Sequence, residues 1–250
     1  MTVKSDVSSN YLTLLHEEHG NKSTRYPVKI LFTGNQRLGS IGRAIQCAVY
    51  SYGNQFTYKG DITQPIDKDQ IDRTFDTLIM CHGASHLDWF EDAPLDKVKN
   101  IFDVNLFGTY NMAQAFVNAT IDAPYRKRII IIGSMAHRAV LNGSSAYCAS
   151  KAGLAHLVRC MAWELAPKGF DVYIIHPSNT LNTPMSEETI EGLMRYRGLT
   201  LEEATAYWND SMVRKRSLTK EEIAELVCVI LTQKLSYLSG SQIELAGGQR

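Results

Sequence analysis

The chain has 250 residues, a length that suits one large domain with a substantial core. Lysine plus arginine number 26, as do aspartate plus glutamate, so no net basic field attracts nucleic acid or a membrane surface. The five cysteines are scattered without a C-x-x-C pair, as is usual for buried cysteines in a reducing compartment. No apolar run approaches the roughly 20 residues of a membrane-spanning helix. These features indicate a cytoplasmic protein with neither a nucleic-acid nor a membrane partner.

Residues 1–27 are predicted to form a polar N-terminal extension. The stretch has no apolar core of the kind that signal peptides carry, and it ends at Pro27. We therefore expect a single domain over residues 28–250.

Short β-branched runs alternate with helix-period segments after this extension. Nearly continuous apolar runs are typical of strands buried on both faces of a parallel sheet. The alternation predicts a Rossmann-like, doubly wound α/β fold of three layers. The predicted strands are 28–34, 77–83, 127–134 and 171–177, with a last strand within 241–248. The predicted helices are roughly 41–52, 95–120, 147–166 and 220–233.

The stretch 53–76, which precedes the strand at 77–83, is short. A complete mononucleotide-binding half needs a second strand, a helix and a third strand there. The available residues leave room for one short strand, about 55–59, and one short helix, about 66–73. The sheet is therefore predicted to be one strand smaller than usual at that edge.

A glycine-containing turn, "TGNQRLGSIGRAI", joins the first strand to the first helix. Its spacing matches neither G-x-G-x-x-G nor G-x4-G-K-[ST]. Gly34 would let the chain leave the strand, and the small residues Gly39 and Ser40 would admit a pyrophosphate. The positive N-terminus of the helix that starts near Ile41 would favour the charge of that group. A purely structural turn is the alternative.

Tyr147 and Lys151 stand four residues apart at the start of a predicted helix, and therefore share one face. A nearby ammonium lowers the pKa of a phenol from its reference value near 10, which suits acid/base chemistry at neutral pH. A solvated surface pair is the alternative. Ser134 ends the predicted strand "KRIIIIGS", at the edge where such folds place their sites. Asn105 lies in the helix before that strand.

At this point the residues resemble those of the short-chain dehydrogenase/reductase family. The resemblance runs from about Val28 to Gly248 and depends on motifs in the family's order. They are "TG…IGRAI", "DIT", "CHGA" in place of the usual N-A-G, "VNLFG", Ser134, "YCASK", "HPSNTLNTPM", "RSLTKEEIAELV" and "SGSQIELAGG".

The resemblance implies a catalytic tetrad and an NAD or NADP cofactor. Tyr147 would be the general acid/base, and Lys151 would lower its pKa and bind the nicotinamide ribose. Ser134 would polarise the substrate carbonyl, and Asn105 would hold a water of the proton relay. The residues implied for the cofactor are Gly34, Arg37, Gly39, Ser40, Ile41, Asp61, Ile62, Gly83, Ala84, Tyr147, Lys151, Pro177 and Thr183. No metal is implied.

Three departures from the family pattern concern the cofactor. Aligned on "IGRAI", the glycine loop is longer than usual and places Ser40 where the second glycine stands, which is similar to the enoyl-acyl-carrier-protein reductases. Cys81 and His82 replace two asparagines, and His82 is expected to pack or hydrogen-bond rather than catalyse. Ser178 replaces the glycine that usually follows the proline.

Selectivity between NAD and NADP normally depends on the end of the second strand, where an acidic residue binds the ribose hydroxyls. Asp61 could take that position or, as "DITQP" favours, the adenine-pocket position of the D-[VI]-T motif. In the second case no acidic selector is left, while Arg37 and Lys59 are basic. The sequence thus favours NADP over NAD by a narrow margin.

A helical segment at about 184–216 resembles the lid that folds over the substrate in this family. Residues that could line a pocket there, or instead pack in a core, are Tyr196, Tyr207, Trp208 and Met212. His137, Arg138 and Asn142 flank the expected carbonyl position and suggest a polar or anionic substrate, with a solvated loop as the alternative.

The leading hypothesis is an NAD(P)-dependent oxidoreductase that acts on a small carbonyl/alcohol pair. The alternatives are a non-catalytic dinucleotide-binding regulatory protein and an enoyl-thioester reductase, the latter suggested by the glycine loop alone. The resemblance also implies a homotetramer or homodimer.

Overall fold

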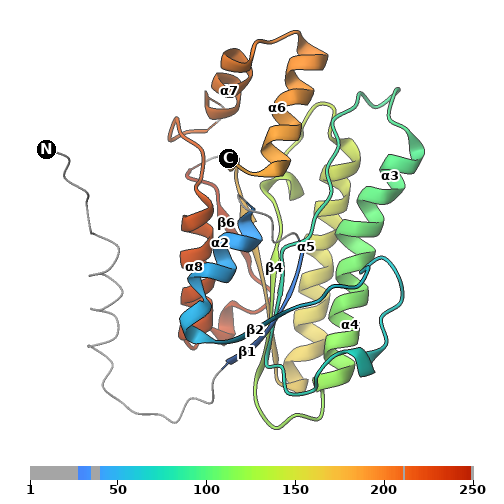
Figure 1. Cartoon of the computed structure of the whole chain (residues 1–250), viewed down its shortest axis with the longest axis vertical. Coiled ribbons are helices and arrows are strands. Elements are labelled where there is room, and N and C mark those ends of the chain that lie inside the picture. The colour runs from blue at the N-terminus through green and yellow to red at the C-terminus, as the bar shows by residue number, and fades with distance from the viewer. Residues whose placement is uncertain (1–27, 35–39, 211, 249–250) are drawn as a thin grey trace, which may run out of the picture.

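The computed structural model describes residues 28–34, 40–210 and 212–248. Within these ranges the chain forms a parallel sheet of six strands in the order β2-β1-β3-β4-β5-β6, with helices on both faces (Figure 1). The predicted Rossmann-like, doubly wound α/β fold is therefore confirmed. The strands are β1 (Val28–Thr33), β2 (Gly53–Thr57), β3 (Thr77–Met80), β4 (Lys127–Ile132), β5 (Phe170–Pro177) and β6 (Gln242–Leu245).

The helices form the two outer layers and a cover at one end of the sheet. They are α2 (Ile41–Ala48), α3 (Leu95–Phe102), α4 (Gly108–Thr120), α5 (Ser145–Leu165), α6 (Pro184–Arg197), α7 (Leu201–Asp210) and α8 (Lys220–Thr232). Helices α2 and α8 lie against one face of the sheet, and α4 and α5 lie against the other (Figure 1). Helices α6 and α7 lie beyond the carboxyl ends of the strands (Figure 1).

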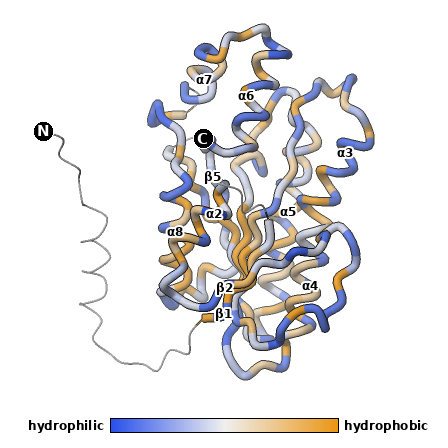
Figure 2. Tube along the Cα trace, in the orientation of Figure 1, coloured by the Kyte–Doolittle hydropathy of each residue, from blue (hydrophilic) through white to orange (hydrophobic). Residues whose placement is uncertain are grey.

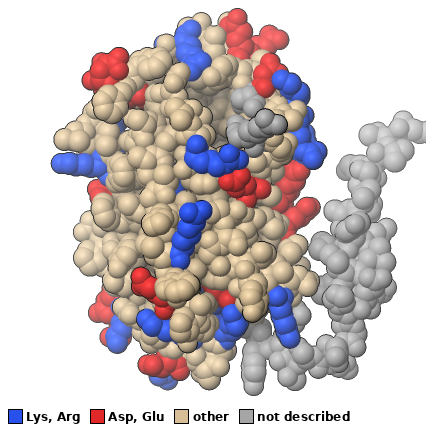
Figure 3. Space-filling view, turned by 180° about the vertical axis from the view of Figure 1, so that it is seen from behind, with Lys and Arg blue, Asp and Glu red and all other residues tan. Residues whose placement is uncertain are grey.

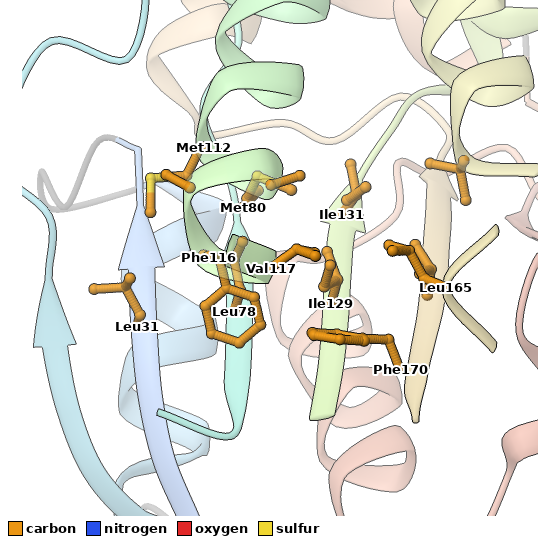
Figure 4. Packing of buried hydrophobic residues seen from close by; sticks show 14 of the residues in the cluster. Leu31, Leu78, Met80, Met112, Phe116, Val117, Ile129, Ile131, Leu165 and Phe170 are labelled. Carbon is orange, nitrogen blue, oxygen red and sulfur yellow. The ribbon is translucent and has the colours of Figure 1, made fainter. Parts of the chain in front are cut away.

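The apolar runs become strands because the sheet is buried on both faces. Successive side chains of a strand point to opposite faces. In β4, Ile129 and Ile131 accordingly pack under α4 and α5, whereas Ile130 and Ile132 pack under α2 and α8. Figure 4 shows the first of these cores, with Phe116 of α4 against the strands. In Figure 2 the sheet is the most hydrophobic part of the trace.

The shortened edge of the sheet is present as predicted. Residues 58–76, all of which the structure describes, contain no strand, so β2 is an edge strand. The helix predicted over about 66–73 is wrong, because only a 3₁₀ turn, Lys68–Gln70, forms there. The side chains of Asp67 and Asp72 accept hydrogen bonds from backbone N–H groups two residues on, which compete with helical bonding.

Two predicted helices are interrupted. The helix at 41–52 stops at Ala48 and is followed by a 3₁₀ turn, Tyr50–Tyr52. The helix at 95–120 contains a π-helical turn, Asp103–Phe107, between α3 and α4. Such turns are frequent at functional sites, and this one carries Asn105.

Acidic and basic side chains are interspersed on the face shown in Figure 3. None of the helices in the described ranges has both the length and the apolarity needed to cross a membrane. The same residues contain no group of His, Cys, Asp and Glu side chains arranged to hold a metal ion.

Candidate active site

The residues predicted for catalysis gather at the carboxyl ends of the central strands. Ser134 follows β4 and caps a short 3₁₀ helix. Tyr147 and Lys151 lie in the first two turns of α5, with the Lys151 ammonium 5.7 Å from the centre of the Tyr147 ring. Asn105, in the π-helical turn before α4, packs toward the same part of α5. The structure thus brings the predicted tetrad together.

Burial keeps the phenol of Tyr147 protonated. Desolvation raises its pKa above the ordinary value of 10.0, and a hydrogen bond with Ser134 opposes this only in part. The predicted lowering of the Tyr147 pKa by Lys151 is therefore wrong for the protein by itself. The ammonium faces the ring, and the cost of burying a phenolate sets the direction of the shift. At neutral pH the Tyr147 hydroxyl therefore carries its proton.

The ammonium of Lys151 is buried without a hydrogen bond to any described residue. Lys151 is only 3% exposed, and this burial lowers the pKa of its ammonium to about 8. A charged donor in such a place has unused hydrogen-bonding capacity, which a polar ligand can satisfy.

This burial makes stability depend on pH in a direction that can be tested. Between the folded pKa of about 8 and the ordinary value of 10.5, the unfolded chain binds more protons, so the stability owed to Lys151 rises with pH. We expect Lys151→Met to be more stable than wild type near neutral pH. The advantage should shrink by on the order of 3 kcal/mol toward about pH 10.5. Urea unfolding of both proteins across this range measures the effect, and parallel stability curves would contradict it.

The side chain of Asn105, 1% exposed, is bonded within the protein. Its Oδ1 accepts from the Ala84 N–H at 2.8 Å, and its Nδ2 donates to the Ala84 carbonyl and the Ser150 hydroxyl, both at 2.9 Å. These bonds tie the loop after β3 to α5. Both amide donors are used, so the relay water, still a prediction, would have to donate to an oxygen of Asn105.

His82 is held by two threonine hydroxyls, as expected for a hydrogen-bonding histidine. Its Nδ1 lies 2.7 Å from Thr33 Oγ1 and its Nε2 lies 2.9 Å from Thr109 Oγ1. The Thr109 hydroxyl donates to the Asn105 carbonyl, so it must accept from Nε2–H of the imidazole. Desolvation lowers the pKa of His82 to about 3, which leaves the ring neutral.

Gly34 makes the turn out of β1 with φ +112°, a backbone conformation that favours glycine. A Cβ atom at this position would lie 2.6 Å from both the Cys81 carbonyl carbon and the His82 nitrogen. Gly34 therefore lies directly against the backbone that follows β3. This close approach is a second reason for glycine that the sequence did not indicate.

Ser40 is the N-cap of α2, and its hydroxyl accepts from the Arg43 N–H at 3.1 Å. Ile41 is the first residue of the helix. The helix N-terminus thus lies at the carboxyl edge of the sheet, where it favours an anion. Arg37 and Gly39, also predicted to contact the cofactor, lie outside the described residues.

Gly83 faces Lys151. A Cβ on this residue would lie 3.5 Å from Asn105 Oδ1, 3.6 Å from Lys151 Nζ and 3.7 Å from Met185 Cε. Any larger side chain would project toward the ammonium. Ala84, the next residue, is held by Asn105. Gly83 therefore leaves a ligand access to Lys151.

Asp61 and Ile62, predicted for the adenine pocket, lie in the turn after β2. The Asp61 carboxylate is exposed and accepts hydrogen bonds from the Thr63 N–H and hydroxyl, which lower its pKa. The Ile62 carbonyl accepts from Asn111 of α4 at 3.2 Å. The contact of either residue with adenine is still a prediction.

Pro177 and Thr183 flank the link from β5 to α6. Pro177 ends the strand, and Thr183 caps α6 in a reciprocal capping box with Ser186. This cap places Met185 next to Tyr147, with its sulfur 3.9 Å from the Tyr147 hydroxyl. Met185 was missed from the sequence, although its position directly after Pro184 in "NTPM" could have indicated it.

Helix α6 is fastened to the loop after β3. Leu87 packs against Gly143 and Gly192, where added Cβ atoms would lie only 3.0 and 2.7 Å from its side chain. The Tyr196 hydroxyl donates to the Asp88 carboxylate, which is largely buried. Both contacts hold α6 beside the loop after β3.

The other residues suggested for substrate contacts have mixed roles. Arg138 binds Glu244 through two hydrogen bonds of 2.8 Å, so its charge is balanced inside the protein rather than offered to an anionic substrate. Trp208 packs in the small core of α6 and α7, and Met212 is buried. Tyr207 is about half exposed. Asn142 and Tyr196 line a shallow surface depression.

These features fit an NAD(P) cofactor. The helix N-terminus at Ser40 suits a pyrophosphate, the open face of Gly83 admits a ligand, and the buried ammonium of Lys151 suits ribose hydroxyls.

Comparisons with known proteins agree with this fold and identify the family. A family model described as "Enoyl-(Acyl carrier protein) reductase" matches residues 40–250. Sorbitol-6-phosphate 2-dehydrogenase of Escherichia coli (strain K12) is 24% identical over 238 residues, or 92% of each protein. A crystal structure of NAD+-bound xylitol dehydrogenase, 21% identical, covers 90% of this chain and 100% of its own with a TM-score of 0.81. A structure of ElxO with NADP bound, 15% identical, covers 90% and 99% with a TM-score of 0.74.

The parallel sheet, the site at its carboxyl edge and these similarities define an oxidoreductase of the NAD(P)-dependent, Rossmann-like class. The chain belongs to the short-chain dehydrogenase/reductase family, as its motifs predicted. It is an enzyme that acts on a carbonyl/alcohol pair.

Proposed function

We propose that the enzyme interconverts a small, polyhydroxylated secondary alcohol and its ketone, with Tyr147 as general acid/base and NADP as the preferred cofactor. The observation that carries the proposal is the meeting of the Tyr147 phenol, Ser134 and the buried Lys151 ammonium beside Gly83. The substrate class is supported by the names of two similar proteins. One is a sorbitol-6-phosphate 2-dehydrogenase, and the other is a xylitol dehydrogenase.

In this mechanism the protein positions the carbonyl and supplies the proton. A bound nicotinamide would supply or accept the hydride. Ser134 and Tyr147 both direct hydroxyls at the carbonyl oxygen, and the Tyr147 phenol, kept protonated by burial, donates the proton during reduction. Lys151 would hold the ribose of a bound cofactor, and its charge would stabilise the phenolate that the proton transfer leaves behind. In alcohol oxidation the same groups act in reverse.

The preference for NADP is supported by the residues directly after β2. The strand ends at Thr57, and Tyr58, Lys59 and Gly60 come next, with no acidic side chain. Asp61 is bonded to its own turn through Thr63. A 2′-phosphate at this edge would therefore meet a lysine and no carboxylate.

Parallel fluorescence titrations with NADPH and NADH test the cofactor proposal. One additional charge-assisted contact to the 2′-phosphate predicts a Kd about tenfold lower for NADPH. Lys59→Gln should reduce the difference between the Kd values for NADPH and NADH. Lys168→Gln, at the opposite end of the sheet, should leave that difference unchanged. A lower Kd for NADH would overturn the preference. Binding of either nucleotide without turnover of any carbonyl or alcohol tested would favour the regulatory alternative.

An enoyl-thioester reductase is the second candidate, because both the glycine loop and the description of the matching family model point to it. The four-residue spacing of Tyr147 and Lys151 speaks against it, since those enzymes carry the pair at wider spacing. NADPH oxidation with crotonyl thioester as the substrate, compared with a ketose panel, distinguishes the two.

A further inference from the structure

The main chain of Ser134 is held on both sides by histidine rings. His176, fully buried near the end of β5, has its Nδ1 3.2 Å from the Ser134 nitrogen. His137 has its Nδ1 3.0 Å from the Ser134 carbonyl oxygen. The two rings stack with centres 3.8 Å apart. Ser134 is therefore held at its main-chain nitrogen and at its carbonyl oxygen, which restricts the backbone that carries its side chain.

The hydrogen-bond network determines the tautomer of His176. Gln242 of β6 donates from its amide nitrogen to the carbonyls of Ala155 and Gly240, so its Oε1 is an acceptor. The His176 Nε2, 2.8 Å from that oxygen, must then carry the proton and donate it. Nδ1 is left with a lone pair that accepts the Ser134 N–H. Burial lowers the pKa of His176 to about 4, which keeps this neutral form.

The Ser134 carbonyl oxygen lies close to both rings, 2.9 Å from His176 Nδ1 and 3.0 Å from His137 Nδ1. Because His176 carries its proton on Nε2, its Nδ1 has none to donate to this oxygen. The carbonyl therefore takes its hydrogen bond from His137. One ring accepts from the Ser134 main chain, and the other donates to it.

The second ring is fixed from the same edge strand. The His137 Nε2 lies 3.4 Å from Glu244 of β6, and Arg138 holds that carboxylate with two hydrogen bonds. The last strand thus supports His176 through Gln242, and its Glu244 carboxylate lies beside His137.

Little space is left for Ser134 to shift. A Cβ on the preceding residue, Gly133, would lie 2.6 Å from His176 Nδ1, so the strand end is pressed against the ring. The Ser134 hydroxyl also accepts from the Ala136 N–H at 3.1 Å, which leaves its proton to point outward toward Tyr147.

We propose that His176 is a positioning residue that orients Ser134 for catalysis and that Gln242 of β6 fixes its tautomer. The proposal rests on the proposed function, because that function has the Ser134 hydroxyl bind the substrate carbonyl. Misplacement of a catalytic group by about 1 Å can cost about 10²-fold in rate, so loss of the His176 contact with Ser134 should lower kcat with little effect on cofactor affinity.

Two amide substitutions distinguish a role of His176 in positioning Ser134 from a role in core packing. In His176→Asn the amide oxygen stands near the position of Nδ1 and can still accept from Ser134. In His176→Gln the amide reaches the position of Nε2 and preserves the bond to Gln242, but no acceptor faces Ser134. If His176 positions Ser134, the kcat of His176→Asn should stay within about threefold of wild type. The kcat of His176→Gln should be about 30–100-fold lower, while both variants keep similar thermal stability and NADPH affinity.

Equal losses in kcat for the two variants, or a larger loss for Asn, would overturn the proposal. His156→Asn and His156→Gln, on the exposed side of α5, serve as controls and should match wild type. If both His176 variants fail to fold, Gln242→Leu removes the partner of Nε2 without touching the ring, and an unchanged kcat there also overturns it. Failure of the proposed function would instead appear as retained activity in Tyr147→Phe.

Discussion

Tyr147→Phe is expected to lower kcat about 10³-fold, because the substitution removes only the proton donor. Phenylalanine retains the ring over which Lys151 lies, so the fold and the cofactor contact should be preserved. Steady-state kinetics on an identified ketone substrate, together with NADPH titration, measures both effects. The expected signature is a loss in kcat with a nearly unchanged cofactor Kd.

Tyr50→Phe provides a matched control, because Tyr50 is 81% exposed and lies far along the chain from α5. It should turn over at the wild-type rate. Turnover by Tyr147→Phe at the same rate would remove this tyrosine from the mechanism, and the assignment of the other tetrad residues would lose its support.

Gly34→Ala is expected to destabilise the protein by about 4 kcal/mol, the sum of about 1–3 kcal/mol for a strained backbone and about 1–3 kcal/mol for overpacking. The residue has φ +112°, and its new methyl group would lie 2.6 Å from backbone atoms of the β3 loop, which cannot rotate away. Urea unfolding followed by circular dichroism gives the difference.

Gly198→Ala separates the two causes. Gly198 has φ +65°, but a Cβ there would have nothing within 4 Å. Gly198→Ala should therefore lose only the stability that backbone strain removes, about 1 kcal/mol. If the two variants lose the same stability, the close approach of Gly34 to Cys81 and His82 does not account for the glycine at position 34.

Several features of this protein are local and could be predicted from the sequence. The β-branched runs of β1, β3, β4 and β5 predict strands buried on both faces, because such runs have no polar side. The shortened edge follows from counting residues 53–76. The four-residue spacing of Tyr147 and Lys151 places them on one helix face, and Ser134 at a strand end belongs to the same edge of the sheet.

Other features depend on which segments meet in space. The direction of the Tyr147 pKa shift is set by burial, which spacing along a helix does not reveal. The engagement of Asn105 with Ala84 and Ser150 could not be anticipated either, because the partners are distant in the chain.

The sequence by itself determined the family, the parallel sheet and the identity of the four candidate catalytic residues, because motifs and periodicity are local properties of the chain. Only the tertiary structure decided how those residues are held: Met185 over Tyr147, and His176 with β6 behind Ser134. The physical reason is that pKa values, tautomers and close backbone contacts depend on burial and on partners far away in the sequence.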